Sequence, residues 1–269
     1  MHTWEPDNVF SGTAWYYARY RPDYPEQVIK LLVDKFSLNS KTRMLDLGCG
    51  TGQIALRLAP YICEVIAIDP QNEMLLEGKS LAARKGVTNI KWLLGESGKL
   101  ANMTPDIGEI DLTVIARAFH WMDREQTLHD LYPMTRAGGG LAIVLDAGPK
   151  DDPPYSPWKA IINNTVQFWL GDIRKAGTKG TYKHPAKRFE TVLEESQFHD
   201  LESVKIKTKR TWTIDRIIGY LYSTSSSSVP VLGDKKESFE ADLRQRLATL
   251  EPSGLFKEEA TTEVIMVWK

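Results

Sequence analysis

Short apolar runs alternate with amphipathic stretches over the first 146 residues of the chain. Five runs have the length of buried strands, at residues 44–47, 65–69, 90–94, 111–116 and 141–145. The stretches between them carry apolar residues at helical spacing, as at 73–85 and after Asp123, a residue type that favours a helix N-cap. This alternation predicts an α/β fold: a doubly wound parallel sheet covered on both faces, with a ligand crevice at the carboxyl ends of its strands.

The flanking regions follow other patterns. A helix is predicted at 25–36, where Pro25 suits the first turn. After Asp146 the pattern predicts a Pro-rich turn at 152–157, a helix at 158–170 and a Gly/Lys-rich loop to Lys183. Further on it predicts a helix at 185–196, a strand at 204–214, a loop at 223–228, a helix at 235–250 and a strand at 264–268.

Composition narrows the function classes. The chain has 269 residues, and 34 basic against 35 acidic side chains leave a net charge of −1, which disfavours nucleic acid as a partner. No run approaches the roughly 20 apolar residues of a membrane span, so we expect a cytoplasmic protein with no membrane partner. We also expect a monomer or homodimer. Cys49 and Cys63 are expected to be free thiols, and the spacing of the five histidines predicts no metal site.

Glycine occupies every second position of the segment that follows the first predicted strand, at Gly48, Gly50 and Gly52. Glycine can adopt positive φ and lets a ligand approach the main chain closely. The loop then opens a predicted helix at 53–59, ending at Pro60, whose first N–H groups would face the ligand. The segment therefore predicts the first half of a nucleotide site.

Two ligand classes compete for such a loop. The dinucleotide fingerprint Gly-x-Gly-x-x-Gly has a glycine at its sixth position, where this chain has Gln53. Asp69, about 20 residues after the first glycine, suits the ribose diol of either NAD or S-adenosylmethionine. The order Asp46-Leu47-Gly48-Cys49-Gly50-Thr51-Gly52 resembles the first motif of the class I S-adenosylmethionine-dependent methyltransferases.

This resemblance implies a seven-stranded Rossmann-like sheet that is mostly parallel with an antiparallel C-terminal strand, and a helical insertion or lid. It implies one methyltransferase domain over 1–269: an N-terminal helical lid (1–40), a cofactor-binding core (41–146), an insertion and helix (147–200) that helps to roof the substrate pocket, and C-terminal strands and helices (201–269). The cofactor is S-adenosyl-L-methionine, and the expected cofactor-binding residues are Arg21, Asp46, Gly48, Cys49, Gly50, Gly52, Gln53, Asp69, Pro70, Met74, Glu96, Ser97 and Arg117.

Individual roles follow from the same resemblance. Asp69 would hold the ribose, Glu96 would accept from the adenine amino group, and Asp46 would lie near the ammonium group of the methionine end. Asp46 has an alternative task, which is fixing the glycine turn. Arg21 could bind the cofactor carboxylate.

The segment Ala118-Phe119-His120-Trp121, together with Tyr20-Arg21-Pro22-Asp23-Tyr24-Pro25, resembles the small-molecule branch of these enzymes. That branch contains methyltransferase type 11, trans-aconitate methyltransferase-like and ubiquinone/menaquinone-type proteins, and the likeness covers residues 16–146. The chain departs from its relatives at 132–140, before the fifth strand. The implied function is methyl transfer to a small metabolite, and Arg19, Arg21 and Arg117 favour a carboxylate-bearing or polar one.

The expected substrate-binding residues are Tyr16, Arg19, Tyr24, Phe119, His120 and Trp121, and the expected catalytic residues are His120 and Tyr20. His120 could act as a general base, since its ordinary pKa of about 6.5 suits proton removal, or it could be a structural histidine behind the pocket. The N-terminal aromatic cluster could likewise line the pocket or form an amphipathic helix packed on the sheet.

Three other functions compete with this one. A protein could bind S-adenosylmethionine as a sensor or partner subunit without transferring a methyl group. A nicotinamide oxidoreductase is disfavoured by Gln53. Asp152-Pro153-Pro154-Tyr155 resembles the signature of DNA amino-methylating enzymes, but it follows the fifth strand instead of the fourth, so a proline turn opening an insertion explains it better.

Overall fold

The computed structural model describes residues 5, 8–146, 156–183 and 185–269. The chain divides into two compact units. The first comprises residues 1–22, 147–183 and 207–261, and the second comprises 23–146, 184–206 and 262–269. Each unit has hydrophobic clusters of its own. The single domain with its four segments stays a prediction.

A seven-stranded sheet runs through the second unit in the order β3-β2-β1-β4-β5-β9-β8. Strands β1 to β5 are parallel, and β9 pairs antiparallel with β5. The α/β fold with an antiparallel C-terminal strand is therefore confirmed. The strands are β1 (Arg43–Leu47), β2 (Glu64–Asp69), β3 (Ile90–Leu94), β4 (Ile110–Ala116), β5 (Thr135–Asp146), β8 (His199–Thr213) and β9 (Leu255–Trp268).

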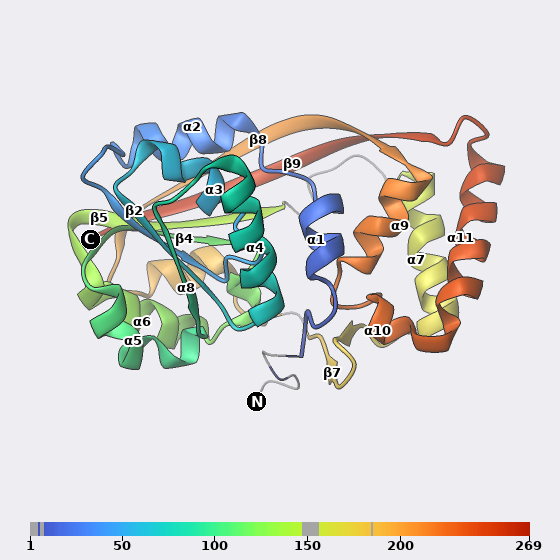
Figure 1. Cartoon of the computed structure of the whole chain (residues 1–269), viewed down its shortest axis with the longest axis horizontal. Coiled ribbons are helices and arrows are strands. Elements are labelled where there is room, and N and C mark those ends of the chain that lie inside the picture. The colour runs from blue at the N-terminus through green and yellow to red at the C-terminus, as the bar shows by residue number, and fades with distance from the viewer. Residues whose placement is uncertain (1–4, 6–7, 147–155, 184) are drawn as a thin grey trace. The chain divides into compact units, whose positions relative to one another are not determined.

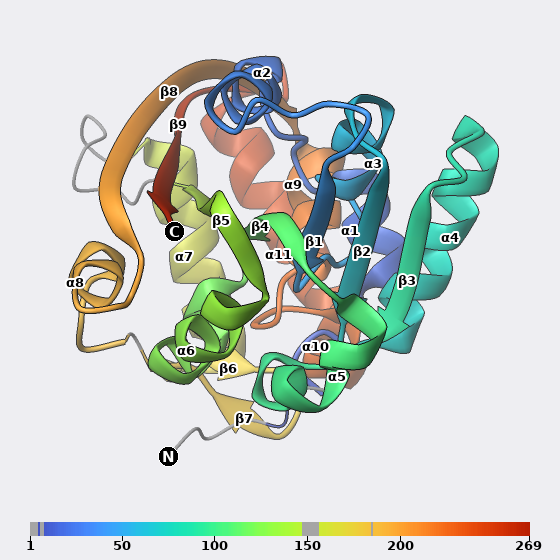
Figure 2. The same ribbon diagram turned by 90° about the vertical axis from the view of Figure 1, so that its left-hand side faces the viewer.

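Helices cover both faces of this sheet because successive strand residues point to opposite sides. One cluster joins alternate strand residues such as Met44 and Val65 to α2 (Glu26–Lys35), α3 (Ala55–Leu58) and α4 (Asn72–Lys85). The other joins residues such as Leu45 and Ile66 to α5 (Leu100–Ile107), α6 (Arg124–Met134) and α8 (Phe189–Glu194). Figure 2 shows the two sets of helices on either side of the strands.

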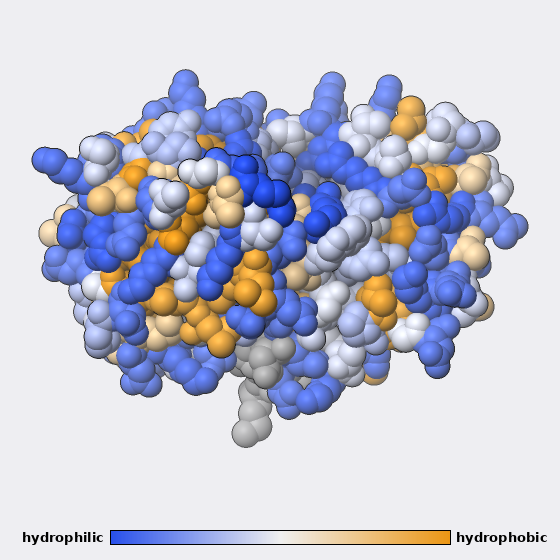
Figure 3. Space-filling model, viewed as in Figure 1, coloured by the Kyte–Doolittle hydropathy of each residue, from blue (hydrophilic) through white to orange (hydrophobic). Residues whose placement is uncertain are grey.

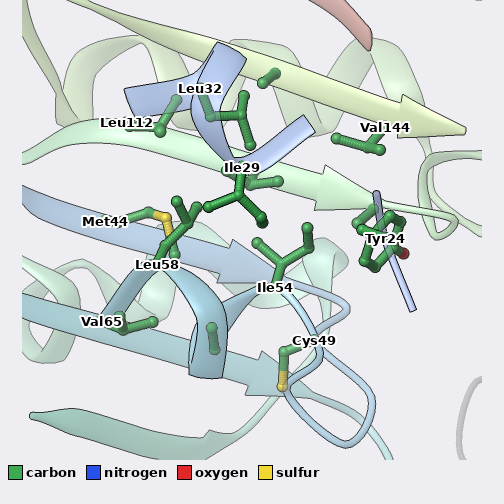
Figure 4. Close-up of a cluster of buried hydrophobic side chains, with 14 of the residues drawn as sticks. Tyr24, Ile29, Leu32, Met44, Cys49, Ile54, Leu58, Val65, Leu112 and Val144 are labelled. Carbon is green, nitrogen blue, oxygen red and sulfur yellow. The ribbon is translucent and has the colours of Figure 1, made fainter. Parts of the chain in front are cut away.

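The first cluster reaches as far as the loop that follows β1. Figure 4 shows Cys49 and Ile54 of this loop beside the strands, with Tyr24 at the same end of the cluster. Each of these three side chains is buried. Burying a large apolar side chain stabilises the fold by about 1.5 to 3 kcal/mol, so the loop is held in place by the core beneath it.

The first unit is mainly helical (Figure 1). It contains α1 (Ala14–Tyr20), α7 (Pro157–Leu170), α9 (Ile214–Tyr222), α10 (Val229–Leu232) and α11 (Lys236–Leu250), and a short hairpin of β6 (Lys175–Ala176) and β7 (Gly180–Thr181). Helix α9 contacts α1 and α11, and α7 contacts α11. Trp158, Trp212, Phe239 and Phe256 lie buried in the core of this unit.

Several sequence predictions need correction. Helices α5, α9 and α10 were missed. The predicted strand at 204–214 ends at Thr213 because the Thr213 side chain accepts from Arg216 N–H and caps α9. The predicted loop before Lys183 contains the β6–β7 hairpin, and the predicted helix at 185–196 is reduced to α8. Helix α3 is shorter than predicted, and Pro60 lies within the 3₁₀ turn Ala59–Tyr61 that continues it.

Other predictions are confirmed. The helix predicted at 158–170 is α7, and Asp123 caps α6 by accepting from Gln126 N–H at 3.1 Å. The remaining short 3₁₀ turns are Ser97–Lys99, Phe119–Trp121 and Gly233–Lys235. The Asp152-Pro153-Pro154-Tyr155 segment lies outside the described residues.

None of the helices in the described part of the chain combines the length and apolar character that a membrane span requires. Among the same residues, no three His, Cys, Asp or Glu side chains are grouped so that they could hold a metal ion. The face drawn in Figure 3 is mostly hydrophilic, with apolar patches between hydrophilic side chains. Cys49 is a buried free thiol and Cys63 an exposed one.

Candidate active site

The carboxyl ends of the parallel strands meet at one edge of the sheet in the second unit. Strands β1, β2, β3 and β4 end at Leu47, Asp69, Leu94 and Ala116. The loops that follow them contain most of the residues that the sequence singled out. In doubly wound sheets this edge is where ligands bind.

The loop after β1 is folded tightly by its glycines. Gly48, Gly50 and Gly52 have φ of 73°, 55° and 78°, the left-handed region that disfavours other residues. The N–H groups of Gly48 and Cys49 both donate to the Ile68 carbonyl oxygen, at 2.8 and 2.9 Å. The loop is therefore clamped to the end of β2.

Gly52 is also required for space. A Cβ atom at this position would lie 2.4 Å from Cη2 of Trp92, and one at Gly78 of α4 would lie 2.6 Å from the same ring. Trp92, on β3, thus fills the space that the two missing side chains leave. Gln53 follows the loop in a half-buried turn.

Asp69 is held rigidly at the end of β2. Its Oδ2 accepts from Gly50 N–H at 2.8 Å and its Oδ1 accepts from Gln71 N–H at 2.9 Å. Burial raises the pKa of Asp69 to about 6, and these two hydrogen bonds act in the opposite direction. Each carboxylate oxygen can accept more than one hydrogen bond, so the fixed side chain can still bind a hydroxyl donor.

Asp46 is 1 % exposed and only partly satisfied. Its Oδ2 accepts from Ala55 N–H at 3.1 Å, whereas Oδ1 has no hydrogen-bond partner within the described chain. Burial, with a further contribution from the charge of Asp69, raises the pKa of Asp46 to about 7. The hydroxyl of buried Thr51, in the same glycine loop, has no partner among the described residues either. Two unsatisfied buried groups beside one loop indicate a ligand that supplies donors.

Cys49 does not fit a reactive role. Its side chain is buried, and burial, followed by the charges of Asp69 and Asp46, raises the pKa of its thiol well above the ordinary value. A thiol that stays protonated is a poor nucleophile. Cys49 therefore contributes a small apolar side chain to the core beneath the loop.

The loops after β2 and β3 carry the remaining predicted cofactor residues. Pro70 directly follows Asp69, and Met74 of α4 is 2 % exposed. Glu96 precedes the 3₁₀ turn Ser97–Lys99 and forms an ion pair of 2.7 Å with Lys99. Glu96 and Ser97 are half-buried at the strand edge, where a planar ligand could reach them.

Arg117, directly after β4, is held from three sides. It has φ of 54°, and its N–H donates to the Val144 carbonyl oxygen at 2.7 Å. Its guanidinium contacts Asp146 through Nε at 2.8 Å and Nη2 at 3.0 Å, and lies 4.4 Å from the centre of the Tyr24 ring. Arg117 and Tyr24 are thus brought together, although Tyr24 was expected to bind substrate.

The next three residues form the 3₁₀ turn Phe119–Trp121. Phe119 is 1 % exposed and packs edge-on against Phe189, with ring centres 5.3 Å apart, so it fills the core. The rings of His120 and Trp121 are half-buried with centres 5.0 Å apart. The substrate-binding role of Phe119 stays a prediction, which its burial disfavours, and the roles of His120 and Trp121 stay predictions.

Four predicted site residues belong to the first unit. Tyr16 and Tyr20 lie on α1, where Tyr16 packs against Tyr222 and the Tyr20 ring occupies the space beside Gly219 of α9. Arg19 donates to the Trp15 carbonyl oxygen at 2.9 Å. Arg21 donates to the Ser223 carbonyl oxygen at 3.1 Å. These contacts are helix packing within the first unit, and the roles in binding and catalysis stay predictions.

Four residues of this site were not predicted from the sequence: Thr51, Gln71, Trp92 and Asp146. Asp146 could have been found, because an acid directly after an apolar strand needs a partner, and the arginine at the end of the neighbouring strand is one. Nothing in the local sequence connects Trp92 with Gly52 and Gly78, since that contact depends on the fold.

Comparison with known proteins agrees with this geometry. Residues 44–139 match the family described as a methyltransferase domain. An uncharacterized methyltransferase of Schizosaccharomyces pombe is 27 % identical over 236 residues, which cover 87 % of this chain and 85 % of the relative. A probable S-adenosylmethionine-dependent methyltransferase of Saccharomyces cerevisiae is 29 % identical over 129 residues, or 48 % of this chain and 43 % of that protein.

A solved structure has the same fold. It is a putative type II methyltransferase from Anaeromyxobacter dehalogenans, with a TM-score of 0.61 and 18 % identity over 92 % of this chain and 97 % of that one. The glycine loop and the acid after β2 are among the residues that carry the resemblance seen in the sequence. The chain therefore contains a methyltransferase domain over residues 44–139 and is similar to the class I S-adenosylmethionine-dependent methyltransferases.

Proposed function

We propose that this protein binds S-adenosyl-L-methionine at the β1–β4 edge of the second unit and transfers its methyl group to a small-molecule acceptor. The observation that carries the proposal is the unsatisfied oxygen of Asp46 beside the glycine loop, next to the rigidly held carboxylate of Asp69. A ligand with an ammonium group and hydroxyl donors would satisfy both side chains. The residues present therefore fit the cofactor that the family implies.

Each group of the site has a task in this proposal. Asp69 would accept from the ribose hydroxyls, because its oxygens are already oriented by Gly50 and Gln71. Asp46 and Thr51 would face the ammonium end, since both carry buried atoms that lack donors or acceptors within the described chain. When bound, the cofactor's sulfonium supplies an activated methyl group. Glu96 and Ser97 would bind the adenine.

The remaining work of the protein is to orient the acceptor. Holding reacting groups at attack distance can be worth about 7 to 11 kcal/mol, so alignment can supply most of the catalysis. His120, half-buried after β4, is the residue of this edge that could remove a proton from a phenol or an amine. Tyr20 stays a second proposed catalytic residue. A carboxylate acceptor would need neither, because it is already ionised.

The charges of the chain support a small acceptor. A net charge of −1 offers little attraction to a nucleic-acid backbone. The three arginines that favoured a carboxylate-bearing acceptor already have partners: Arg117 has Asp146, and Arg19 and Arg21 have backbone carbonyl oxygens. An acidic acceptor therefore needs another cation.

Calorimetry with S-adenosylmethionine and S-adenosylhomocysteine tests the cofactor assignment. Asp69→Asn should weaken binding of both by about 10- to 100-fold, because it removes charge-assisted hydrogen bonds worth roughly 1.5 to 3 kcal/mol. Asp106→Asn removes an exposed carboxylate of the same unit and is the matched control. Binding of NAD in place of the adenosyl ligands would contradict the assignment.

A second assay tests methyl transfer. Purified protein with S-adenosylmethionine is offered a fractionated metabolite extract, and formation of S-adenosylhomocysteine is followed together with a mass increase in one small molecule. Turnover with one fraction, lost in Asp69→Asn, supports the proposal. Tight cofactor binding with no turnover in any fraction favours a sensor or partner subunit instead.

A further inference from the structure

The first unit contains a buried guanidinium nitrogen that has no hydrogen-bond partner within the described chain. It is Nη2 of Arg210. Arg210 lies on β8 between Thr208 and Trp212, and side chains two positions apart share one face of a strand. Trp212 is buried on this face, and Arg210 is half-buried beside it.

The carboxylate of Glu258, on the neighbouring strand β9, already has partners. Strand β9 lies beside β8, and Thr208 Oγ1 donates to the Ala260 carbonyl oxygen at 3.3 Å, which places Glu258 opposite the stretch from Arg210 to Trp212. Glu258 accepts from Trp212 Nε1 at 2.6 Å and pairs with Lys159 Nζ at 2.8 Å. Each of its oxygens therefore already has a donor, and Nη2 of Arg210 is not one of them.

A second buried donor, on a ring that packs against Trp212, also has no hydrogen-bond partner among the described residues. Trp158, at the start of α7, packs with its ring centre 6.2 Å from that of Trp212 and 5.8 Å from that of Phe256. Its indole nitrogen is buried and has no hydrogen-bond partner among the described residues. An indole N–H can only donate, and so can a guanidinium. Both unsatisfied groups therefore require an acceptor.

The charges of the side chains around Trp212 also favour a bound anion. Lys159, Arg210 and Arg216, whose guanidinium lies 5.3 Å from the centre of the Trp212 ring, carry three positive charges, whereas Glu258 carries one negative charge. A half-buried charge without a partner is unfavourable, whereas an apolar side chain of similar size would fit this face without that penalty. The presence of arginine here is explained if an anion binds to it.

We propose that Arg210 and the indole N–H of Trp158 bind the oxyanion group of a small ligand, a carboxylate or a phosphate, in the first unit. A guanidinium matches either group with two parallel hydrogen bonds, and the indole adds a third donor. This inference does not rest on the proposed function, because no residue of the cofactor site takes part in it.

Nuclear magnetic resonance of the full-length, ¹⁵N-labelled protein without cofactor tests the proposal. The chain has eight tryptophans, so Trp158→Phe identifies the indole signal of Trp158 while keeping an aromatic ring in the core. Inorganic phosphate and succinate are titrated separately. We expect a saturable shift of the Trp158 indole signal with at least one of them, and at least about tenfold weaker binding in Arg210→Gln, as expected for a lost charge-assisted pair.

Lys209→Gln is the matched control. It removes the same charge one position away, from a side chain that is 88 % exposed on the other face of β8. Arg210→Lys keeps the charge without the planar fork and serves if Arg210→Gln fails to fold; it too should bind more weakly. Saturation by succinate alone assigns a carboxylate ligand, and saturation by phosphate alone assigns a phosphate.

Two results would overturn the proposal: no saturable shift with either anion, or equal weakening in Lys209→Gln and Arg210→Gln, which would indicate general charge attraction only. S-adenosylmethionine binding is measured by calorimetry on the same preparations. Loss of cofactor binding with intact anion binding would refute the proposed function alone, and the reverse result would refute this inference alone.

Discussion

Asp46→Asn should stabilise the ligand-free protein at alkaline pH while weakening its binding of the cofactor. Burial raises the pKa of Asp46 from 3.8 to about 7. At about 1.4 kcal/mol for each pH unit, keeping this carboxylate ionised in the folded protein costs about 4 kcal/mol above pH 7. The asparagine amide oxygen can still accept from Ala55 N–H, and its amide nitrogen takes the place of Oδ1, which has no partner within the described chain.

The sign of the pH dependence follows from proton linkage. Between about pH 4 and pH 7 the folded protein holds a proton on Asp46 that the unfolded chain has lost, so unfolding releases a proton and wild-type stability falls as the pH rises. The asparagine side chain of the variant does not titrate. The stability advantage of Asp46→Asn should therefore grow with pH, by about 2 to 3 kcal/mol between pH 5 and pH 8.5.

Urea unfolding followed by tryptophan fluorescence at the two pH values measures this difference. Asp106→Asn, which changes an exposed carboxylate of α5 in the same unit, controls for net charge. Calorimetry on the same samples should show weaker S-adenosylmethionine binding in Asp46→Asn. If the stability difference between Asp46→Asn and wild type is the same at both pH values, or shrinks as the pH rises, the buried-charge reasoning is refuted.

Three further outcomes are expected. Gly52→Ala should destabilise the fold by at least about 2 kcal/mol in urea unfolding, because its Cβ would meet Trp92 at 2.4 Å. Gly86→Ala is also at positive φ but has nothing within 4 Å of the added Cβ, so it should cost only about 1 kcal/mol. Equal losses of stability in the two variants would contradict this. Arg117→Gly should unfold at higher urea than Arg117→Ala, since φ is 54° there, and the opposite order would exclude backbone strain. Cofactor binding near pH 7 should release a proton as Asp46 ionises, so the calorimetric enthalpy should depend on buffer ionisation heat; an enthalpy independent of buffer would contradict this.

Local patterns in the chain were enough to predict the sheet and the cofactor loop. Strands β1 to β4 are short apolar runs, and a buried parallel strand needs little more than such a run between helices. Gly48, Gly50 and Gly52 were recognisable because only glycine takes positive φ readily, and all three do so. Asp69 was recognisable because an acid that ends an apolar strand requires donors. In each case a few adjacent residues carry the whole signal.

The tertiary structure alone decided the features that join distant parts of the chain. Trp92 fills the space beside Gly52 and Gly78, and Asp146 neutralises Arg117, although none of these residues adjoins its partner in sequence. The division into two units was equally hidden, because the first unit gathers three separate segments around a core of its own. Arg210 stands out only after Glu258 is seen to be engaged by Lys159 and Trp212. Such features depend on which side chains the fold brings together, and periodicity and composition carry no information about that pairing.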